Sequence, residues 1–482
     1  MTGFYRTIIS SVIVLLCAGC SGERRVTTQS QEALGYYTTG VAQWEKFYYS
    51  EAAAAFDEAL RLDSTFAMAW ARRALLDNAL QNHSRAMADI FRAMSLLGRV
   101  SPFEQMFIRL QDERLRNAND QAAGLADSML HLYPGEKEIY LIRGNLFEER
   151  KNFEDAIRSY RRAIRIDTNY ALAVMSLGYA YSTTGDQENA VAQMSRYIRL
   201  APDAADPRAS FADILLRVGR YDEAMEQYRQ SLLLKPDYWY SANQIAGIEM
   251  ARGMLGASEE QFHKGLAALP QNDQLKATRL AIDGNLNVLR GRYKEAVLQY
   301  RRALDLDSSN SEASYGLVSA FRKQRDFHSA EEVLGGIRRD LAARNLLGTQ
   351  FMLKYDLVWS RVLLDEGKPD EARAFCDSAL DYSTVVSRGP VFRQIAEIDL
   401  AQRRFDDAFE SCDEALRTNP NHPDPLFTLV KIYHTTGDSV MTREISDRLF
   451  GFWKDADPDF QTLLELRAIL GEKTRPAQHP AL

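Results

Sequence analysis

The chain has 482 residues, with 59 Lys and Arg against 66 Asp and Glu, a formal net charge of −7 and 46% hydrophobic residues. This balance is typical of a packed soluble protein and excludes a disordered chain. The mild acidity argues against a protein that binds nucleic acid through phosphate contacts, and four cysteines exclude a disulfide-rich scaffold. Length alone suggests about three ordinary domains.

Residues 1–19 have the pattern of an export signal. Arg6 precedes a mostly apolar run, 8–16, and the small residues Ala18 and Gly19 follow. A charge, an apolar core and small cleavage-site residues in this order are typical of a secretory signal peptide. The apolar run is shorter than the ~20 residues that a membrane-spanning helix needs. We therefore expect a cleaved signal rather than a membrane span.

The sequence around Cys20 resembles the lipobox of bacterial lipoproteins. Ala18, Gly19 and Cys20 match that motif, whereas Cys17 stands where the family usually has Leu. The resemblance implies that Cys20 is lipidated and becomes the mature N-terminus; the alternative is an ordinary signal with a chance cysteine at the cleavage site. Ser21 follows Cys20 where an inner-membrane retention signal would usually be Asp. The resemblance thus implies a lipid anchor in the outer membrane, facing the periplasm of the cell envelope.

Residues 20–32 are expected to form the lipid anchor and a polar tether. The polar stretch 21–31 reaches at most about 36–40 Å when extended. The folded part of the protein should therefore lie close to the membrane surface.

A block of 16 residues recurs along the rest of the chain, and its clearest copy is 221–236. A small residue in the middle of each copy serves as a marker of its position. The markers are Ala52, Ala86, Ala122, Ala156, Ala190, Ala224, Ser258, Ala296, Ala330, Ala372, Ala408 and Thr442. Seven of the eleven intervals between them are 34 residues. This period and pattern resemble the tetratricopeptide repeat, a helix–turn–helix unit. The resemblance covers roughly residues 33–456 and implies an all-α superhelical solenoid of about 12 units, with contacts almost entirely between neighbouring repeats.

Each position in the unit has a packing role. The markers are mostly Ala because helices that cross closely need small side chains where they touch. Twelve residues earlier a second small residue recurs, as at Gly144, and four residues after the marker a bulky residue such as Tyr160 follows. A glycine five residues before a marker should end the first helix in the left-handed conformation. These glycines are Gly185, Gly219, Gly253, Gly291, Gly367 and Gly437.

Departures from the 34-residue period predict irregular joints. Four extra residues fall near 271–276 and eight near 345–352, where we expect a bend or a longer helix. Ser101 and Glu104 predict a capping box at a helix start. After the repeats, 457–470 should form a helix that caps the exposed end of the array. Residues 471–482 should be disordered.

The sequence lacks the motifs of common catalytic and metal sites. There is no Walker A loop, no H-E-x-x-H, no paired C-x-x-C and no G-x-S-x-G. We therefore expect no enzyme activity, no cofactor and no metal site. Cys376 and Cys412 occupy equivalent core positions in consecutive repeats, about 10 Å apart, which is too far for a disulfide. Two buried thiols are expected instead.

The resemblance implies that first-helix side chains outside the core line an inner groove that binds peptides. By register, these residues are Tyr37, Trp44, Tyr179, Tyr240, Tyr315, Arg322, Lys323, Arg361, Arg393, Phe427 and Lys431. The later members are aromatic and basic, which favours an acidic or C-terminal peptide segment as the occupant. The alternative is an ordinary solvated helix face. The Lys and Asn clamp of chaperone-binding members is not present in register, because Asn145 and Asn285 match only single positions.

The leading hypothesis is a membrane-anchored scaffold for protein–protein interaction in the bacterial cell envelope. Its partners would be other proteins or peptide segments, and the membrane through the lipid anchor, with no nucleic acid and no evident small-molecule substrate. An accessory protein for polysaccharide synthesis or export is the alternative, because similar repeat lipoproteins occur in such systems and the groove carries aromatic residues. An enzyme with a site on the solenoid surface is the third class, which the missing motifs disfavour.

Overall fold

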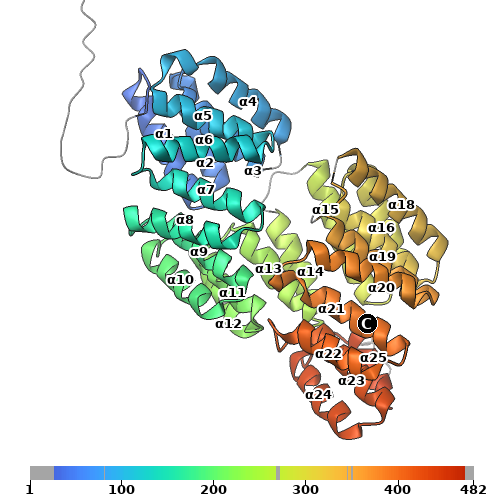
Figure 1. The fold of residues 1–482 in the computed structure, drawn as a ribbon. Helices are drawn as coiled ribbons and strands as arrows, with labels where there is room; N and C mark the ends of the chain where they lie inside the picture. The colour runs from blue at the N-terminus through green and yellow to red at the C-terminus, as the bar shows by residue number, and fades with distance from the viewer. Residues whose placement is uncertain (1–25, 81, 268–271, 345, 349–350, 473–482) are drawn as a thin grey trace, which may run out of the picture. The chain divides into compact units, whose positions relative to one another are not determined.

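A computed structural model describes residues 26–472 except 81, 268–271, 345 and 349–350 (Figure 1). The described residues form 25 α-helices and two short 3₁₀ helices and contain no β-strand. The predicted all-α class is confirmed. The export signal, Cys20 and residues 473–482 of the predicted tail lie outside the described residues. Within the described ranges, no helix combines the length and apolar character needed to cross a membrane.

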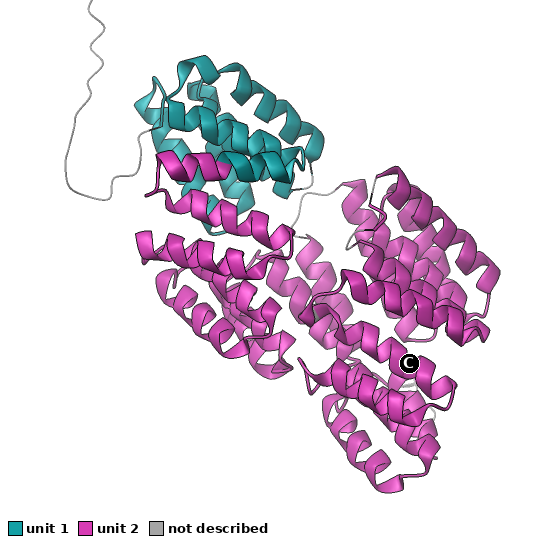
Figure 2. Ribbon diagram, viewed as in Figure 1, with its two compact units in different colours: residues 1–125 teal, residues 126–482 magenta. Residues whose placement is uncertain are grey.

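The chain divides into two compact units, residues 1–125 and 126–482 (Figure 2). The helices that lie wholly in unit 1 are α1 (Gln31–Glu45), α2 (Tyr49–Leu62), α3 (Ala67–Ala79), α4 (His83–Ser95), η1 (Leu97–Arg99) and α5 (Pro102–Leu115). The boundary falls within α6 (Asn119–Leu132).

Unit 2 contains the remaining helices. They are α7 (Lys137–Glu149), α8 (Phe153–Ile166), α9 (Ala171–Thr184), α10 (Gln187–Leu200), α11 (Asp206–Arg217), α12 (Tyr221–Leu234), α13 (Trp239–Ala251), α14 (Leu255–Ala267), α15 (Asp273–Leu289), α16 (Tyr293–Leu306), α17 (Ser311–Lys323), α18 (Phe327–Ala343), α19 (Met352–Glu366), α20 (Pro369–Tyr382), η2 (Val385–Ser387), α21 (Gly389–Ala401), α22 (Phe405–Leu416), α23 (Pro423–Thr436), α24 (Ser439–Phe452) and α25 (Gln461–Ile469). Up to α24, an odd-numbered helix is the first helix of a repeat and the even-numbered helix after it is the second.

Residues 27–29, which the sequence assigns to the tether, are bound to unit 1. Thr27 donates from its backbone nitrogen to Glu104 Oε1 at 2.7 Å and from Oγ1 to Glu104 Oε2 at 2.6 Å. The Gln29 backbone nitrogen donates to Asp63 Oδ2 at 3.2 Å. Ser30 then caps α1, which begins at Gln31. The tether is therefore shorter than predicted, because two carboxylates of unit 1 accept hydrogen bonds from its last residues.

In eleven of the twelve repeats the turn between the two helices holds one residue in the left-handed conformation; the equivalent residue of the remaining repeat, 81, lies outside the described residues. All six predicted glycines have positive φ, between 73° and 90°. In five described turns without glycine at this position, another residue adopts the same conformation, with φ between 58° and 60°. These residues are Phe47, Asn117, Lys151, Arg325 and Arg403. The packing of the two helices therefore determines the backbone conformation of the turn, whether or not the residue is glycine.

The core follows the predicted spacing. The eleven markers from Ala52 to Ala408 are fully buried, and Thr442 is 4% exposed. The ring of Tyr160, four residues after its marker, is buried against Gly144, where a Cβ atom would lie only 2.2 Å from Tyr160 Cε1. A small residue on the first helix therefore provides the space that a bulky residue on the second helix fills.

The two irregular joints are accompanied by longer helices. The first helix α15 and the second helix α18 have 17 residues each, against 13 or 14 in most other helices of the array. Most of the connecting residues between α14 and α15, and part of the connection between α18 and α19, lie outside the described ranges. The sequence predicts a bend or a longer helix at both joints, and a longer helix adjoins each of them.

Unit 2 also contains contacts between repeats that are far apart in the sequence. The Asp457 backbone nitrogen donates to the Gly253 carbonyl oxygen, and the Gly256 nitrogen donates to Asp457 Oδ2, both at 2.8 Å. Trp453 Nε1 donates to the carbonyl oxygen of Ala251, 202 residues earlier, at 3.0 Å. The segment after α24 is therefore bound to the turn between α13 and α14. We call the contacts between residues 219–292 and 419–469 the seam.

The seam extends over neighbouring repeats on both sides. Asn419 Nδ2 donates to the Tyr221 hydroxyl oxygen at 3.1 Å, and Arg292 pairs with Asp459 at 2.9 Å. The last helix, α25, shares one hydrophobic core with α14, α15 and α23. Contacts almost entirely between neighbouring repeats are expected, and most helix contacts follow this expectation, but the seam of unit 2 is an exception to it. Repeats about six positions apart touch one another, which a 34-residue sequence window does not reveal.

Candidate functional site

The last five first helices of unit 2 lie next to one another, in the order α15, α17, α19, α21 and α23. We call the side chains that these helices present away from their second helices the first-helix surface. Seven of the predicted groove residues belong to it. They are Tyr315, Arg322 and Lys323 on α17, Arg361 on α19, Arg393 on α21, and Phe427 and Lys431 on α23.

The two predicted residues of α1 lie within aromatic clusters of unit 1. Tyr37 is only 6% exposed, and its ring centroid lies 4.9 Å from that of Phe66 and 6.0 Å from that of Phe56. Trp44 is half-buried, with its ring 5.6 Å from that of Tyr49. Tyr37 therefore belongs to the core rather than to an open surface.

Tyr179 on α9 and Tyr240 on α13 converge on one carboxylate, Asp213 of α11. Tyr179 donates to Asp213 Oδ2 at 2.7 Å, and Tyr240 donates to the same atom at 2.9 Å. Tyr228 donates to Oδ1. Burial raises the pKa of Asp213, although these hydrogen bonds oppose the shift. Both tyrosine hydroxyls therefore form hydrogen bonds within the protein. Their acceptor, Asp213, is not among the residues that the sequence predicts for the groove. Asp213 occupies the register of Tyr179 one repeat later, so the same register argument could have identified it.

A second carboxylate in this region, Asp206 of α11, is buried. It accepts hydrogen bonds from Tyr197 and Tyr238 at 2.9 Å and from Ser210 at 3.2 Å. Burial raises the pKa of Asp206 to about 6, even though the three hydroxyl donors lower it. This group joins α10 and α11 to Tyr238, the residue directly before α13, through buried hydrogen bonds.

The two later aromatic residues are covered by lysines. Tyr315 is 8% exposed and Phe427 is 7% exposed. Lys354 Nζ lies 4.7 Å from the Tyr315 ring centroid, and Lys431 Nζ lies 4.6 Å from that of Phe427. Because the faces of these rings bear a cation, this part of the surface presents ammonium groups rather than open aromatic faces.

Most charges of the first-helix surface are paired between neighbouring repeats. Lys354 pairs with Glu312 at 2.8 Å, and Glu312 also accepts a hydrogen bond from Asn285 at 3.0 Å. Arg322 pairs with Asp365 at 2.5 Å. These contacts connect α15, α17 and α19, and they occupy Asn285, the residue that would have matched a chaperone clamp.

Not every charged side chain has an ion-pair partner where α19, α21 and α23 meet. Arg393 pairs with Glu397 at 2.9 Å, and the two side chains are 12% and 24% exposed. Arg361 Nε donates to the neutral Oε1 atom of Gln394 at 3.3 Å. Burial and the nearby Arg393 lower the pKa of Arg361 to about 10. Burial raises the pKa of Glu397, but Arg393, Lys431 and Arg361 outweigh it and hold this pKa below its usual value.

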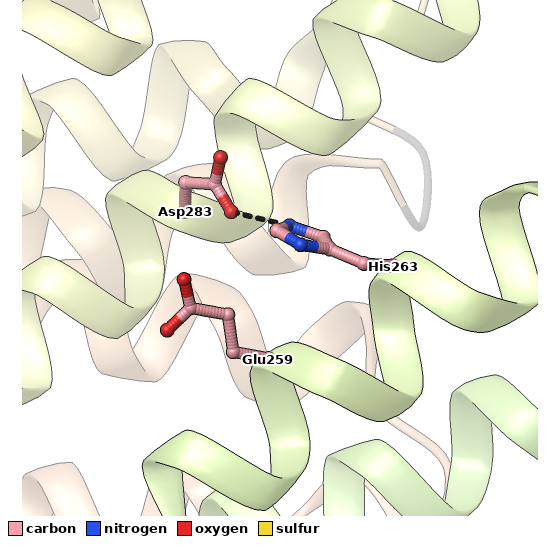
Figure 3. Close-up of side chains that lie close together, drawn as sticks. All are labelled: Glu259, His263 and Asp283. Carbon is pink, nitrogen blue, oxygen red and sulfur yellow. Dashed lines mark hydrogen bonds and ion pairs between the residues drawn. The ribbon is translucent and has the colours of Figure 1, made fainter.

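A cluster of possible metal ligands lies between α14 and α15 (Figure 3). The ligand atoms of Glu259, His263 and Asp283 lie within 4.8 Å of one another, and His263 Nε2 is 2.8 Å from Asp283 Oδ1. Arg279 donates to His263 Nδ1, so Nε2 carries the proton and donates to Asp283. Arg290 pairs with Glu259 at 3.0 Å. A metal ion would have to displace the Nε2 proton and bind close to the guanidinium groups of Arg279 and Arg290, so the geometry favours a network of hydrogen bonds and an ion pair over a metal site.

The two core cysteines are free and buried. Cys376 Sγ lies 3.2 Å from the Ser360 hydroxyl oxygen. Burial raises the pKa of Cys376 to about 11 and that of Cys412 to about 12. The prediction of two buried thiols is confirmed, and their high pKa values disfavour a nucleophilic role.

Comparisons with known proteins agree with the repeat pattern. A family model described as TPR repeat matches residues 144–185 and 284–324. A second model, described as tetratricopeptide repeat, matches residues 171–204 and 207–238. The human "Tetratricopeptide repeat protein 13" is 25% identical over 178 residues, which are 35% of this chain and 20% of that protein. The chain therefore matches about a fifth of the length of this curated relative and contains tetratricopeptide repeats.

Solved structures with similar segments have low overall similarity. Yeast Tom70 is 13% identical over 92% of this chain and 96% of its own, with a TM-score of 0.36. MamA is 23% identical over 33% of this chain and 93% of its own, with a TM-score of 0.29. A thermophilic TPR protein of Thermus thermophilus is 19% identical over 38% of this chain and 97% of its own, with a TM-score of 0.34. None of these likenesses carries an argument about partners.

Proposed function

We propose that the protein is an interaction scaffold of the bacterial cell envelope, anchored by a lipid on Cys20, which binds partner proteins or peptide segments on the first-helix surface. Tetratricopeptide repeats typically bind other proteins and are not typically catalytic. The observation that supports this surface most directly is the group of partly buried, unevenly paired charges at Arg361, Arg393 and Lys431.

The anchor proposal is supported by the lipobox-like sequence and by the short tether. Thr27 and Gln29 are hydrogen-bonded to unit 1, so only residues 21–26 would separate Cys20 from the folded part. Six residues span at most about 20–22 Å. A lipid on Cys20 would therefore hold unit 1 close to the outer-membrane surface, on its periplasmic side.

The alternative, an accessory protein for polysaccharide synthesis or export, rests mainly on aromatic side chains in the groove. Tyr179 and Tyr240 use their hydroxyls on Asp213, and Tyr315 and Phe427 are buried under lysines. These four aromatic side chains are therefore less available for stacking against a sugar ring, which favours a protein partner.

The anchor is tested with Cys20→Ala in the full chain. We expect loss of labelling by a radioactive fatty acid and release from the membrane fraction, because no acyl chain would remain. Cys376→Ala removes a different thiol and should keep both. Labelling and membrane association that persist in Cys20→Ala would overturn the anchor.

The interaction surface is tested by charge reversal of two lysines, Lys323→Glu with Lys431→Glu. We expect reduced co-purification of partner proteins that can themselves capture the chain in reciprocal experiments. Arg443→Glu, on the second helix α24, is the matched control and should retain them. Equal recovery of partners from all three proteins would place the interaction elsewhere.

A further inference from the structure

Exposed apolar side chains gather around the connection between α12 and α13. Leu233 is 74% exposed, Trp239 44% and Leu234 40%. Three of the thirteen large hydrophobic side chains that are exposed in the described part of the chain thus lie within seven residues. Single exposed hydrophobic side chains are ordinary, but a group of them marks a surface that another molecule covers. We call residues 232–239 the α12–α13 patch.

A pocket lies beside this patch, between α12, α13 and α14. Leu232 and Trp239 line it, together with Ala242 of α13 and Gly265 of α14. These two helices approach closely there, since a Cβ atom added to Gly265 would lie 3.2 Å from the Ala242 Cβ. The pocket has a volume of about 230 Å³, below the roughly 300–1,000 Å³ of usual small-molecule sites. Its size and lining therefore suit one or two apolar side chains.

The patch combines such a pocket with a side chain that could fill it. Leu233, with 74% exposure, directly follows Leu232, which lines the pocket. A surface with both features can cover itself, because in a dimer with two-fold symmetry every contact between the two copies is made twice. Leu233 of each copy would enter the pocket of the other copy, and both would leave water.

The charges at the pocket are also self-complementary. Asp237, in the connection before α13, and Lys264, on α14, both line the pocket. Asp237 is 63% exposed and pairs with Lys235 at 3.0 Å rather than with Lys264. Lys264 is exposed and forms no ion pair with any residue that the structure describes. A second copy would bring its own Asp237 to Lys264, and the reciprocal pair would form by symmetry.

We propose that the α12–α13 patch is a homodimer interface, in which two copies of the chain pack this patch and α14 against each other about a two-fold axis. Leu233 and Trp239 supply the apolar contacts, and Lys264 of each copy pairs with Asp237 of the other. A different protein would have to supply an apolar side chain and a carboxylate in matching positions, whereas a second copy carries both. The dimer goes beyond the scaffold function, because it presents two first-helix surfaces in one assembly.

Co-expression of two full chains with different tags tests the interface. The chains are purified in mild detergent through the first tag, and the recovered amount of the second tag is measured. We expect recovery for the wild type and a loss of at least tenfold for Leu233→Glu, because a carboxylate would enter the apolar pocket. Val440→Glu, at a position of α24 with the same 74% exposure, should keep the wild-type recovery. Equal recovery from Leu233→Glu and Val440→Glu would overturn the interface.

Charge reversal tests whether the two copies meet in the proposed register, and it uses exposed positions. Lys264→Asp brings like charges together at both contacts of its own dimer, and so does Asp237→Lys. Each variant should therefore recover less of itself than the wild type does. The two variants expressed together with different tags should recover each other at the wild-type level, because opposite charges then meet at both contacts. Failure of this mixed pair, or undiminished recovery of each variant with itself, would contradict the two-fold arrangement.

Light scattering of the purified wild-type chain, with the detergent contribution subtracted, gives the number of copies directly. We expect two copies at micromolar concentrations. One copy would overturn the proposal, and a photo-crosslinker at Leu234 that then captured a different protein would assign the patch to that partner. Loss of the dimer would leave the scaffold function standing, because capture of partners through Lys323 and Lys431 is measured separately.

Discussion

Every described turn residue five positions before a marker adopts the left-handed conformation, whether or not it is glycine. Arg403 has φ of 59°, and Gly437 has φ of 83° one repeat later. An L-residue pays a steric penalty in this region that glycine does not. The repeats that lack glycine therefore carry local backbone strain, which the surrounding helix packing compensates.

Arg403→Gly should stabilise the protein by about 1 kcal/mol, because it relieves that strain at an exposed position. The midpoint of thermal unfolding measures the effect. Gly437→Ala is the opposite control: no atom lies within 4 Å of an added Cβ, so only the backbone strain changes, and a loss of about 1 kcal/mol is expected. A lower midpoint for Arg403→Gly would show that its side chain contributes more than the strain costs.

Asp206 gives one core position a pH-dependent contribution to stability. Burial raises its pKa to about 6 in the folded chain, above the value of about 3.9 for an unfolded Asp. The folded state therefore keeps this proton more tightly than the unfolded state does. The contribution of Asp206 is fully present below about pH 4 and is lost as the pH rises through about 6.

Asp206→Asn should remove this dependence. We compare the unfolding free energies of the wild type and the variant. The stability advantage of the wild type should fall by about 2–3 kcal/mol between pH 4 and pH 7. Urea unfolding at a series of pH values measures the difference. A difference that stays constant, or that grows with pH, would mean that the tyrosine hydroxyls keep Asp206 ionised throughout.

At the scale of a helix pair, the sequence predicts the packing because each rule acts within one repeat. The spacing of Gly144, the Ala156 marker and Tyr160 places a small residue against a ring, and the structure confirms it. Which first-helix side chains remain open depends on the neighbouring repeats. Tyr179 is engaged by Asp213 of the next repeat, and Tyr315 is covered by Lys354 in the same way. The position of a residue within the repeat therefore predicts that it lies on the first-helix surface, but not whether its side chain is accessible there.

Gly144→Ala should therefore destabilise unit 2 although Ala favours helices. The added Cβ would lie 2.2 Å from Tyr160 Cε1, and overpacking of this kind costs about 1–3 kcal/mol. Gly247→Ala, also inside a first helix but with no atom within 4 Å, should instead stabilise by about 0.5–1 kcal/mol. Thermal unfolding of both variants decides the point, and an equal gain in both would show that the Tyr160 ring moves aside freely.

At the scale of unit 2, the seam changes how stability is distributed. A solenoid with contacts only between neighbours has a stability that is roughly a sum of repeat and interface contributions. The contacts of Trp453, Asp457 and Asp459 with residues 251–292 add a connection across about six repeats. The sequence could not predict the seam, because the curvature of a solenoid depends on the rotation between successive repeats, which the pattern within one repeat does not specify.

Trp453→Ala should destabilise the distant helices α13 and α14. The side chain is 2% exposed and donates to the Ala251 carbonyl oxygen, and its truncation should cost about 3–5 kcal/mol. Hydrogen exchange followed by mass spectrometry should show faster exchange in residues 239–267. Trp359→Ala, which lies on α19 outside the seam, should leave exchange in that segment unchanged. Normal protection of residues 239–267 in Trp453→Ala would mean that the seam carries little stability.

The central claim is that partner proteins contact the first-helix surface. Site-specific photo-crosslinking in cells that express the full chain tests it most directly, with the crosslinker at Ser319 on α17 or at the exposed Leu298 on the second helix α16. We predict that Ser319 gives an adduct with a specific protein, identified by mass spectrometry, and that Leu298 does not. An adduct of the same protein from Leu298 and none from Ser319 would contradict the account.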